Sequence, residues 1–303
     1  MTDNKTITKN DIVKGLKQLG VITSDNIIMH SSLSSLGNVD GGAKTVVDAV
    51  LEVIGSNGTL AVPAFNWNID SFDSKITPSI VGAITEEVRN RKNAVRSLHP
   101  THSIVAIGPL AEIICEGHEK TTAFGRGSAL YKFLQANPKI LQIGTDNTTN
   151  SIIHVAEEIV KVPYLQSAKE KIIKISNGKS VNVKLPGCSR GFLNIDDELS
   201  DSGEVNIIKI GNADVRLTKA RLVVDTAVKM LKFDPASLLC DNADCVTCAM
   251  NRATIDAVSV EEIEKEIIEI QKEDEKALRI IESKFNCTEV EFPGFDSSDI
   301  YRN

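Results

Sequence analysis

Residues 139–161, KILQIGTDNTTNSIIHVAEEIVK, contain the unit that decides the fold. The segment begins with a short apolar run that ends at Gly144, which is typical of a buried strand. The polar stretch TDNTTN follows as a loop, and a helical pattern begins near Asn150 or Ser151. The segment therefore predicts a strand, a loop and a helix in direct succession.

The same alternation of strand and helix extends outward from this unit. Apolar runs predict strands at 26–33, 58–65, 102–108 and 139–144. Helical patterns occupy 8–20, 41–55, 79–90, 110–117, 129–136 and 151–161. The first helix has Thr8 as its N-cap and ends at Gly20. This alternation favours an α/β fold with αβα layers, in which helices cover both faces of a largely parallel or mixed sheet.

The pattern changes after Pro163. Two β-rich runs in 169–187 flank an Asn177-Gly178 turn, which predicts an antiparallel hairpin. A strand at 204–211, a helix at 217–233 and a long charged helix at 259–285 follow. We expect one structural domain over 1–303, divided into an α/β part (1–165), a β-rich part (166–255) and a C-terminal helix and tail (256–303).

Composition excludes several classes of protein. The 303 residues include 34 Lys plus Arg against 41 Asp plus Glu, a net charge of -7 without a basic run, which argues against a nucleic-acid partner. No apolar run approaches the roughly 20 residues that span a bilayer, and the first ten residues have no apolar signal core. We therefore expect no membrane partner and a cytoplasmic protein, whose six cysteines are reduced thiols.

His154 and Glu157 lie three residues apart in the predicted helix 151–161, so their side chains share one face. A histidine near a helix N-terminus meets the positive end of the helix dipole, which favours the neutral imidazole that can accept a proton. A carboxylate beside it would fix its tautomer and stabilise the imidazolium. The pair is a candidate general base and its orienting partner, and the alternative is a solvated polar face of the helix.

Two further stretches are polar. In MHSSLSSLGNVDGG (29–42) a strand runs into serines and glycines whose small side chains and amides suit phosphate or pantetheine oxygens, although the stretch matches no P-loop or dinucleotide motif. The alternative is an ordinary polar turn.

Arg96, His99 and His102 precede or begin a strand. We interpret the histidines as structural groups that bond to the backbone, because no carboxylate or cysteine lies beside them at zinc-like spacing.

Taken together, these stretches carry a family resemblance. The motifs HSSLSSLG, GG before a helix, GTLAVPAF, RSLHPTHSIVAIG, GHEKTTAFGRGSALYKFL, ILQIGTDN and NSIIHVAEE follow one another over residues 10–165. This series resembles the aminoglycoside 3-N-acetyltransferase family in order and spacing. The resemblance implies the antibiotic N-acetyltransferase fold, and an enzyme that moves an acetyl group from acetyl-CoA to a primary amine of an aminosugar by direct transfer.

The resemblance also assigns roles to residues of this chain. His154 would be the base, Glu157 would orient it, and Ser151, where the family usually has threonine, would keep a hydroxyl near the thioester oxygen or in the helix cap. The residues implied in coenzyme binding are Ser31, Ser32, Leu33 and Gly37 in the loop, with Ser103, Ile104, Val105 and Ala106 along the pantetheine arm. The candidates for the acceptor side are Trp67, Asp70, Asp146 and Glu157, and we expect the hairpin around Asn177-Gly178 to pack at the edge of the acceptor cleft.

Several alternatives remain open at the level of sequence. The loop NWNIDSFDSKITPS (66–79) is shorter than the corresponding stretch in many resistance enzymes, so the acceptor is either an aminoglycoside or a biosynthetic aminosugar or sugar nucleotide. A non-catalytic protein that binds CoA or a sugar is the alternative from a different class, although it would have no reason to keep His154, Glu157 and Ser151 together. The chain could act as a monomer or a homodimer.

Four cysteines form the last open question. Cys240, Cys245 and Cys248 have C-x-x-x-x-C-x-x-C spacing, and Cys188 follows the predicted hairpin. Four thiolates could hold a structural zinc ion. Because such spacing also arises by chance, we favour free buried thiols and assign no metal ligand.

Overall fold

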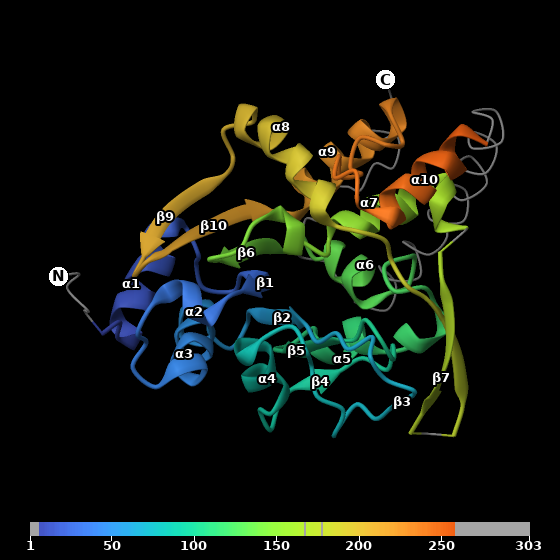
Figure 1. Cartoon of the computed structure of the whole chain (residues 1–303). Helices are drawn as coiled ribbons and strands as arrows, with labels where there is room; N and C mark the ends of the chain where they lie inside the picture. The colour runs from blue at the N-terminus through green and yellow to red at the C-terminus, as the bar shows by residue number, and fades with distance from the viewer. Residues whose placement is uncertain (1–5, 167, 177, 258–303) are drawn as a thin grey trace, which may run out of the picture.

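The computed structural model describes residues 6–166, 168–176 and 178–257 (Figure 1). The helices are α1 Lys9–Leu19, α2 Leu33–Leu36, α3 Gly42–Ile54, α4 Ala83–Arg89, α5 Ala111–Cys115, α6 Ala129–Leu134, α7 Ile153–Val160, α8 Asp196–Asp201, α9 Ala220–Phe233 and α10 Val246–Asp256. The strands are β1 Asn26–Ser31, β2 Thr59–Pro63, β3 Ser71–Phe72, β4 Val95–Arg96, β5 Ile104–Ile107, β6 Lys139–Ile143, β7 Glu170–Ile175, β8 Ser180–Lys184, β9 Asn206–Ile210 and β10 Ala213–Lys219. Short 3₁₀ helices occur at η1 His118–Lys120, η2 Asn147–Thr149, η3 Pro163–Leu165 and η4 Arg190–Ile195.

The main sheet has seven strands in the order β4-β5-β2-β1-β6-β10-β9. Its centre is parallel, because β1 pairs in parallel with both β2 and β6, and Ile28 lies opposite Ala61 and Ile140. Both flanks are antiparallel: β5 runs against β2 and β4, and β10 runs against β6 and β9. The sheet is therefore mixed, as the sequence predicted.

Helices cover both faces of this sheet. One core cluster joins α1, α3 and α4 to side chains such as Ile27 and Met29, and the other joins α5, α6, α7 and α9 to side chains such as Ile28. Neighbouring residues of β1 thus point to opposite layers, as the pleat of a strand requires. Figure 1 shows α1 and α3 at the blue end of the chain, apart from α6, α7 and α9. The predicted αβα layering is confirmed.

The local signals at α1 are confirmed as well. The Thr8 side chain accepts a hydrogen bond from the Asp11 backbone, and the Asp11 carboxylate accepts one from the Thr8 backbone, which makes a capping box. Gly20 ends the helix in the left-handed region at φ 103°, where glycine carries no Cβ penalty. Helix α1 therefore begins and ends where the sequence indicated.

The predicted hairpin is also present. Strands β7 and β8 pair antiparallel, Gly178 in their turn has φ +83°, and β3 pairs with β7 to complete a three-stranded sheet. Figure 1 shows β7 projecting away from the main sheet. Asn177 of the predicted turn, and the predicted helix 259–285 with the tail, lie outside the described residues.

Two predictions for the C-terminal third need correction. The helix predicted at 217–233 begins only at Ala220, because residues 217–219 finish β10. That strand was missed: Val215, Leu217 and Thr218 are buried beside β6, but the polar residues between them obscure the apolar run. Helix α10 was also missed, because the region was interpreted only through its cysteines. In the described part of the chain no helix is both long and apolar enough to cross a membrane.

Candidate active site

A cavity of about 450 Å³ opens at the carboxyl ends of the central parallel strands. Ser31 ends β1, Pro63 ends β2 and Thr145 follows β6, and all three line it. Ligands in open α/β sheets gather at this edge, where the strands end and the loops diverge. The loop 145–151 and the first turn of α7 form the floor that contains His154.

His154 and Glu157 form the predicted pair on α7. Nδ1 of His154 lies 2.6 Å from Oε2 of Glu157, and the Tyr164 hydroxyl donates to Oε1 of the same carboxylate at 2.8 Å. An ionised carboxylate only accepts hydrogen bonds, so the imidazole proton is on Nδ1 and Nε2 is left to accept a proton. Burial and the negative charge of Glu157 raise the pKa of Tyr164 well above its ordinary value, which keeps its hydroxyl a donor.

Aromatic rings fix the plane of the His154 imidazole. Phe124 stacks on it with ring centroids 4.7 Å apart and an angle of 20°, and Phe192 meets it edge-on, also at 4.7 Å. His154 is 7% exposed and Glu157 is 3% exposed. Because the ring is hydrogen-bonded to Glu157 and packs against Phe124 and Phe192, its orientation is fixed.

His154 lies between two cavities rather than at the end of one. It lines the 450 Å³ cavity, whose described lining has no acidic or basic side chain other than histidine, and also a second cavity of about 260 Å³. Glu157 and Glu158 line the second cavity. Burial raises the pKa of Glu158, which accepts a hydrogen bond from Thr122 at 2.6 Å. Lys161 and Lys184 line the second cavity as well. The imidazole therefore separates an uncharged space from one lined by charged side chains of both signs.

Two buried polar atoms in the larger cavity lack a hydrogen-bond partner among the described residues. They are Nε2 of His30 and Oδ1 of Asn150. Burial lowers the pKa of His30 to about 4, so its ring is neutral near pH 7. Leaving such atoms unsatisfied costs about 1–3 kcal/mol each. They are sites where a bound ligand can supply the missing hydrogen bond.

His102 was interpreted as structural, and the structure corrects this. It lines the cavity, where its ring packs against Phe65 and Phe124, and Nδ1 contacts the Thr101 hydroxyl at 2.9 Å. Burial lowers its pKa to about 3. His99 fits the structural interpretation, because its Nδ1 accepts a hydrogen bond from the His102 backbone. Sequence spacing could not separate the two, since both histidines are buried and only one points to the cavity.

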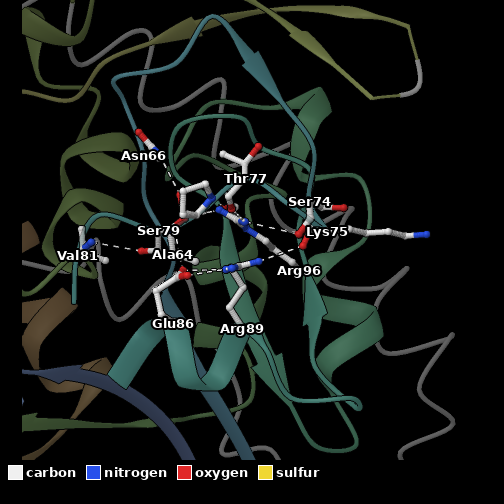
Figure 2. Close-up of polar contacts among 12 residues, drawn as sticks. Ala64, Asn66, Ser74, Lys75, Thr77, Ser79, Val81, Glu86, Arg89 and Arg96 are labelled. Atoms are coloured by element: carbon white, nitrogen blue, oxygen red, sulfur yellow. Dashed lines mark hydrogen bonds and ion pairs between the residues drawn. The ribbon is translucent and has the colours of Figure 1, made fainter. Parts of the chain in front are cut away.

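Arg96 anchors the loop 64–81, which forms one wall of the cavity (Figure 2). Its guanidinium donates to the backbone carbonyls of Ala64 and Thr77, and Nε donates to the Ser103 hydroxyl at 2.9 Å. Burial lowers the pKa of Arg96 to about 10. Trp67, from the same loop, lines the cavity. Arg96, which stood out in the sequence only as a neighbour of two histidines, thus fixes both ends of this loop.

A second ion pair holds the same loop from α4. Figure 2 shows Glu86 and Arg89 joined by two hydrogen bonds, of 2.7 and 2.9 Å. Glu86 also accepts from the Ser79 backbone, and Arg89 donates to the Lys75 carbonyl. These contacts satisfy backbone groups that have no strand partner, so the loop keeps one conformation without regular structure.

The comparisons with known proteins show the family of the chain. A sequence model of the family described as aminoglycoside 3-N-acetyltransferase matches residues 28–232, which contain the sheet centre, His154 and both cavities. The chain belongs to this family. The resemblance seen in the sequence is confirmed, and the mixed α/β fold is that of the antibiotic N-acetyltransferases.

Relatives in the aminoglycoside 3-N-acetyltransferase family match to different extents. Aminoglycoside N(3)-acetyltransferase III of Acinetobacter baumannii is 30% identical over 178 residues, which are 52% of this chain and 62% of that protein. The match thus spans less than two thirds of that relative. The SPbeta prophage-derived acetyltransferase-like protein YokD of Bacillus subtilis is 28% identical over 73% of this chain and 91% of its own length.

A solved family structure covers more of the chain. A histidine-to-alanine mutant of aminoglycoside acetyltransferase AAC(3)-IVa, in complex with a gentamicin, has a TM-score of 0.77 and 26% identity. The similarity covers 84% of this chain and 100% of that one.

The residues that the family resemblance assigned to the coenzyme lie in different places. Ser31 lines the cavity, but Ser32, Leu33 and Gly37 are not part of the lining. The hydroxyl of Ser32 accepts a hydrogen bond from Ser35 at 2.9 Å, within the turn that contains α2. The strand residues predicted along the pantetheine arm, Ser103, Ile104, Val105 and Ala106, are at most 1% exposed and line neither cavity, so their role stays a prediction. Strands β2 and β4 flank β5, and the Ser103 hydroxyl donates to the Ala64 carbonyl.

The residues predicted for the acceptor side also lie in different places. Trp67 and Glu157 each line one of the two cavities. Asp70 is 98% exposed, pairs with Lys171 on the hairpin and lines neither. Asp146 accepts hydrogen bonds from the Thr148 backbone and hydroxyl and lines neither cavity. Ser151 lines the larger cavity but is not the cap of α7, whose N-cap is Ile152.

The wall opposite Trp67 comes from residues 185–192, after the predicted hairpin. Leu185 and Pro186 line both cavities, and Phe192 contacts His154. The segment that leaves the hairpin therefore reaches both cavities, whereas the expected place of the Asn177-Gly178 turn at the cleft edge stays a prediction. The lining residues after the hairpin were not identified in the sequence. Their signal was weak, because the segment is short, contains Pro186 and Gly187, and has no strand or helix periodicity.

Proposed function

We propose that this chain is an acetyl-CoA-dependent N-acetyltransferase that moves an acetyl group directly to a primary amine of an aminoglycoside or a related aminosugar. The observation that carries the proposal is the Tyr164, Glu157 and His154 hydrogen-bond chain at the junction of two cavities. Family membership supports the reaction class. Because the first curated relatives are matched over only part of their length, the activity is a proposal for this chain.

The reaction needs one base and no covalent enzyme intermediate. The acceptor ammonium first releases one proton to solvent and becomes a neutral amine. Nε2 of His154 then takes a second proton from this nitrogen as it attacks the thioester carbonyl carbon. The carbonyl π electrons move to oxygen, where the Ser151 hydroxyl donates a hydrogen bond. When the C–N bond is complete, the C–S bond breaks, and the CoA thiolate leaves and receives the proton from the imidazolium. Glu157 stabilises the imidazolium between these two proton transfers.

The two cavities divide the substrates in this proposal. The uncharged cavity beside Ser31 receives the acetyl group and the pantetheine arm, and its two orphan polar atoms on His30 and Asn150 fit the amides of that arm. The second cavity, which is lined by Glu157 and Glu158 together with Lys161 and Lys184, receives the amine at its carboxylates. An aminosugar is a cation before it reacts, and carboxylates are the groups that stabilise a bound cation. Glu158→Gln should therefore raise the acceptor KM and leave the acetyl-CoA KM unchanged.

The decisive experiment is His154→Ala, assayed by CoA thiol release with aminoglycosides, simple aminosugars and amino-bearing sugar nucleotides. A positioned base contributes about 10²–10⁴-fold to turnover, so kcat should fall by that factor while the Kd for acetyl-CoA changes little. His118→Asn is the matched control. His118 is a buried histidine that contacts Ser97 and the Ala123 carbonyl and lines neither cavity, so its variant should lose thermal stability but keep its kcat when folded.

Near-wild-type turnover of His154→Ala would overturn the mechanism. A lower melting temperature without a specific loss of kcat would make His154 a structural residue. If the wild-type protein acetylates aminosugars or sugar nucleotides but no aminoglycoside, the acceptor is biosynthetic and the mechanism stands. If it binds CoA and turns over no amine in the panel, the chain is a binding protein.

A further inference from the structure

Four cysteine side chains converge at a point outside both cavities. Cys188 follows the β7–β8 hairpin, Cys240 follows α9, and Cys245 and Cys248 lie at the start of α10. Their sulfur atoms all lie within 4.8 Å of one another. Residues separated by about fifty positions in the chain thus meet at one place, and the fold brings all four thiols there from three separate segments.

The distances between the sulfur atoms are those of ligands around one ion. Sγ of Cys240 lies 3.8 Å from Sγ of Cys188 and 3.5 Å from Sγ of Cys248. Four sulfur atoms at about 2.3 Å from a tetrahedral zinc ion are about 3.8 Å apart. A disulfide would need about 2.0 Å, so no two of these thiols are bonded to each other.

The surroundings suit thiolates. Cys240, Cys245 and Cys248 are buried, and the Arg190 backbone N–H donates to Sγ of Cys188 at 3.4 Å. Arg252 donates to the Cys240 carbonyl at 3.1 Å and so fixes the loop before α10. N–H donors to metal-bound sulfur and a fixed ligand loop are the outer contacts that orient the ligands of structural metal sites.

We propose that Cys188, Cys240, Cys245 and Cys248 bind one structural Zn²⁺ through four thiolates. Binding displaces the four thiol protons to solvent and forms four Zn–S bonds, with no change of oxidation state. The sequence analysis favoured free buried thiols, and the convergence of Cys188 with the other three is the observation that reverses this preference. Four protein ligands leave no open position, so the ion has no direct part in a reaction.

The ion would hold one wall of the larger cavity in place. Cys188 lies within the wall 185–192, and the other three ligands lie next to or on α10, which packs against η3, the segment that contains Tyr164. Gly191 supports the same junction, because a Cβ there would lie 2.4 Å from the Leu238 carbonyl oxygen. The zinc thus joins an irregular wall to a helix where no strand pairing is available.

The first test is the metal content of the full chain, purified under reducing conditions without chelator. Mass spectrometry of the metals should find about one zinc and no stoichiometric iron per chain. X-ray absorption should show only sulfur neighbours at about 2.3 Å. Less than a fifth of one equivalent after reduction and incubation with Zn²⁺ would overturn the proposal, as would stoichiometric iron or a shell of nitrogen and oxygen atoms.

Variants then locate the site. Cys188→Ser should lower zinc content at least fivefold, whereas Cys115→Ser, which changes a buried thiol outside the group, should keep it. Zinc retained equally in both variants would place the metal elsewhere. If Cys188→Ser does not fold, titrating the wild-type protein with a mercurial should release zinc as four thiols react, and release without thiol modification would refute the assignment. Stripping zinc with a chelator should also increase amide exchange in 185–192 but not in α1.

Discussion

Glu157→Gln is the substitution that separates the charge of the pair from its geometry. The glutamine side chain keeps the shape of the carboxylate and can still accept from Nδ1 of His154, while its amide can donate to the Tyr164 oxygen. The His154 ring therefore keeps its position and tautomer. What is lost is the negative charge beside the imidazolium, at a site where Glu157 is 3% exposed.

The size of the loss follows from the geometry. Nδ1 and Oε2 are 2.6 Å apart, and the two charge centres are farther apart than these atoms. Unit charges about 4 Å apart interact by about 4 kcal/mol at an effective dielectric constant near 20. With about half of the proton transferred in the transition state, about 2 kcal/mol is lost, which is about 30-fold in kcat. The defect is therefore smaller than the one expected for His154→Ala.

The assay is the steady-state rate of thiol release, with melting temperature measured on the same preparation. Glu158→Gln is the matched control. It removes a neighbouring carboxylate that lines the same cavity but is not hydrogen-bonded to His154. The kcat of this variant should remain within a few fold of wild type. A Glu157→Gln kcat within threefold of wild type would refute the role of the charge. A loss as large as that of His154→Ala would show that position, and not charge, is what Glu157 provides.

Three further outcomes follow from contacts described above. Arg96→Met should release the loop 64–81 and raise the KM for the substrate in the larger cavity at least tenfold, with a smaller change in kcat, as measured by steady-state kinetics. An unchanged KM would show that the loop keeps its conformation without Arg96. Ser31→Val should raise the acetyl-CoA KM without changing the acceptor KM, and equal values in mutant and wild type would remove Ser31 from the coenzyme site. Burial lowers the pKa values of His30, His102 and His118 from 6.5 to about 4, 3 and 4, respectively. Below pH 6.5 the unfolded chain therefore binds more protons than the folded chain. The free energy of unfolding should fall as the pH is lowered, until the pKa values of the folded state are reached. The loss is about 2 kcal/mol per imidazole at pH 5, and equal unfolding free energies in urea at pH 7.5 and pH 5 would contradict it.

The parts of the fold that the sequence predicted are those with strong local signals. The N-cap at Thr8, Gly20 at the end of α1 and the apolar run of β6 each act over a few residues, and the structure has them where they were expected. Strand β10 was missed because its identity depends on pairing with β6, more than seventy residues earlier in the chain. Its own residues, ADVRLTK, alternate only loosely.

The site also divides into residues with a local signal in the sequence and residues whose place depends on distant contacts. His154 and Glu157 could be paired from the sequence because three residues on a helix fix their distance. His102 could not be assigned, since the sequence does not show whether the ring of a buried histidine faces a cavity or the protein interior. The cysteines could not be judged either, because Cys188 approaches the other three only after α9 has packed against α7.

The two walls of the larger cavity do not belong to the seven-stranded sheet. One is the loop fixed by Arg96, and the other is the segment that contains Cys188, while His154 is on a helix packed in the core. Variation in either wall can therefore change the shape offered to the acyl group without moving the imidazole. Such a division permits a gene to diverge toward new acyl donors by insertion, deletion or exchange of wall segments, while selection on proton transfer acts on a separate set of residues. Grafting the 64–81 loop of a relative onto this chain would transfer acyl-donor preference as a unit.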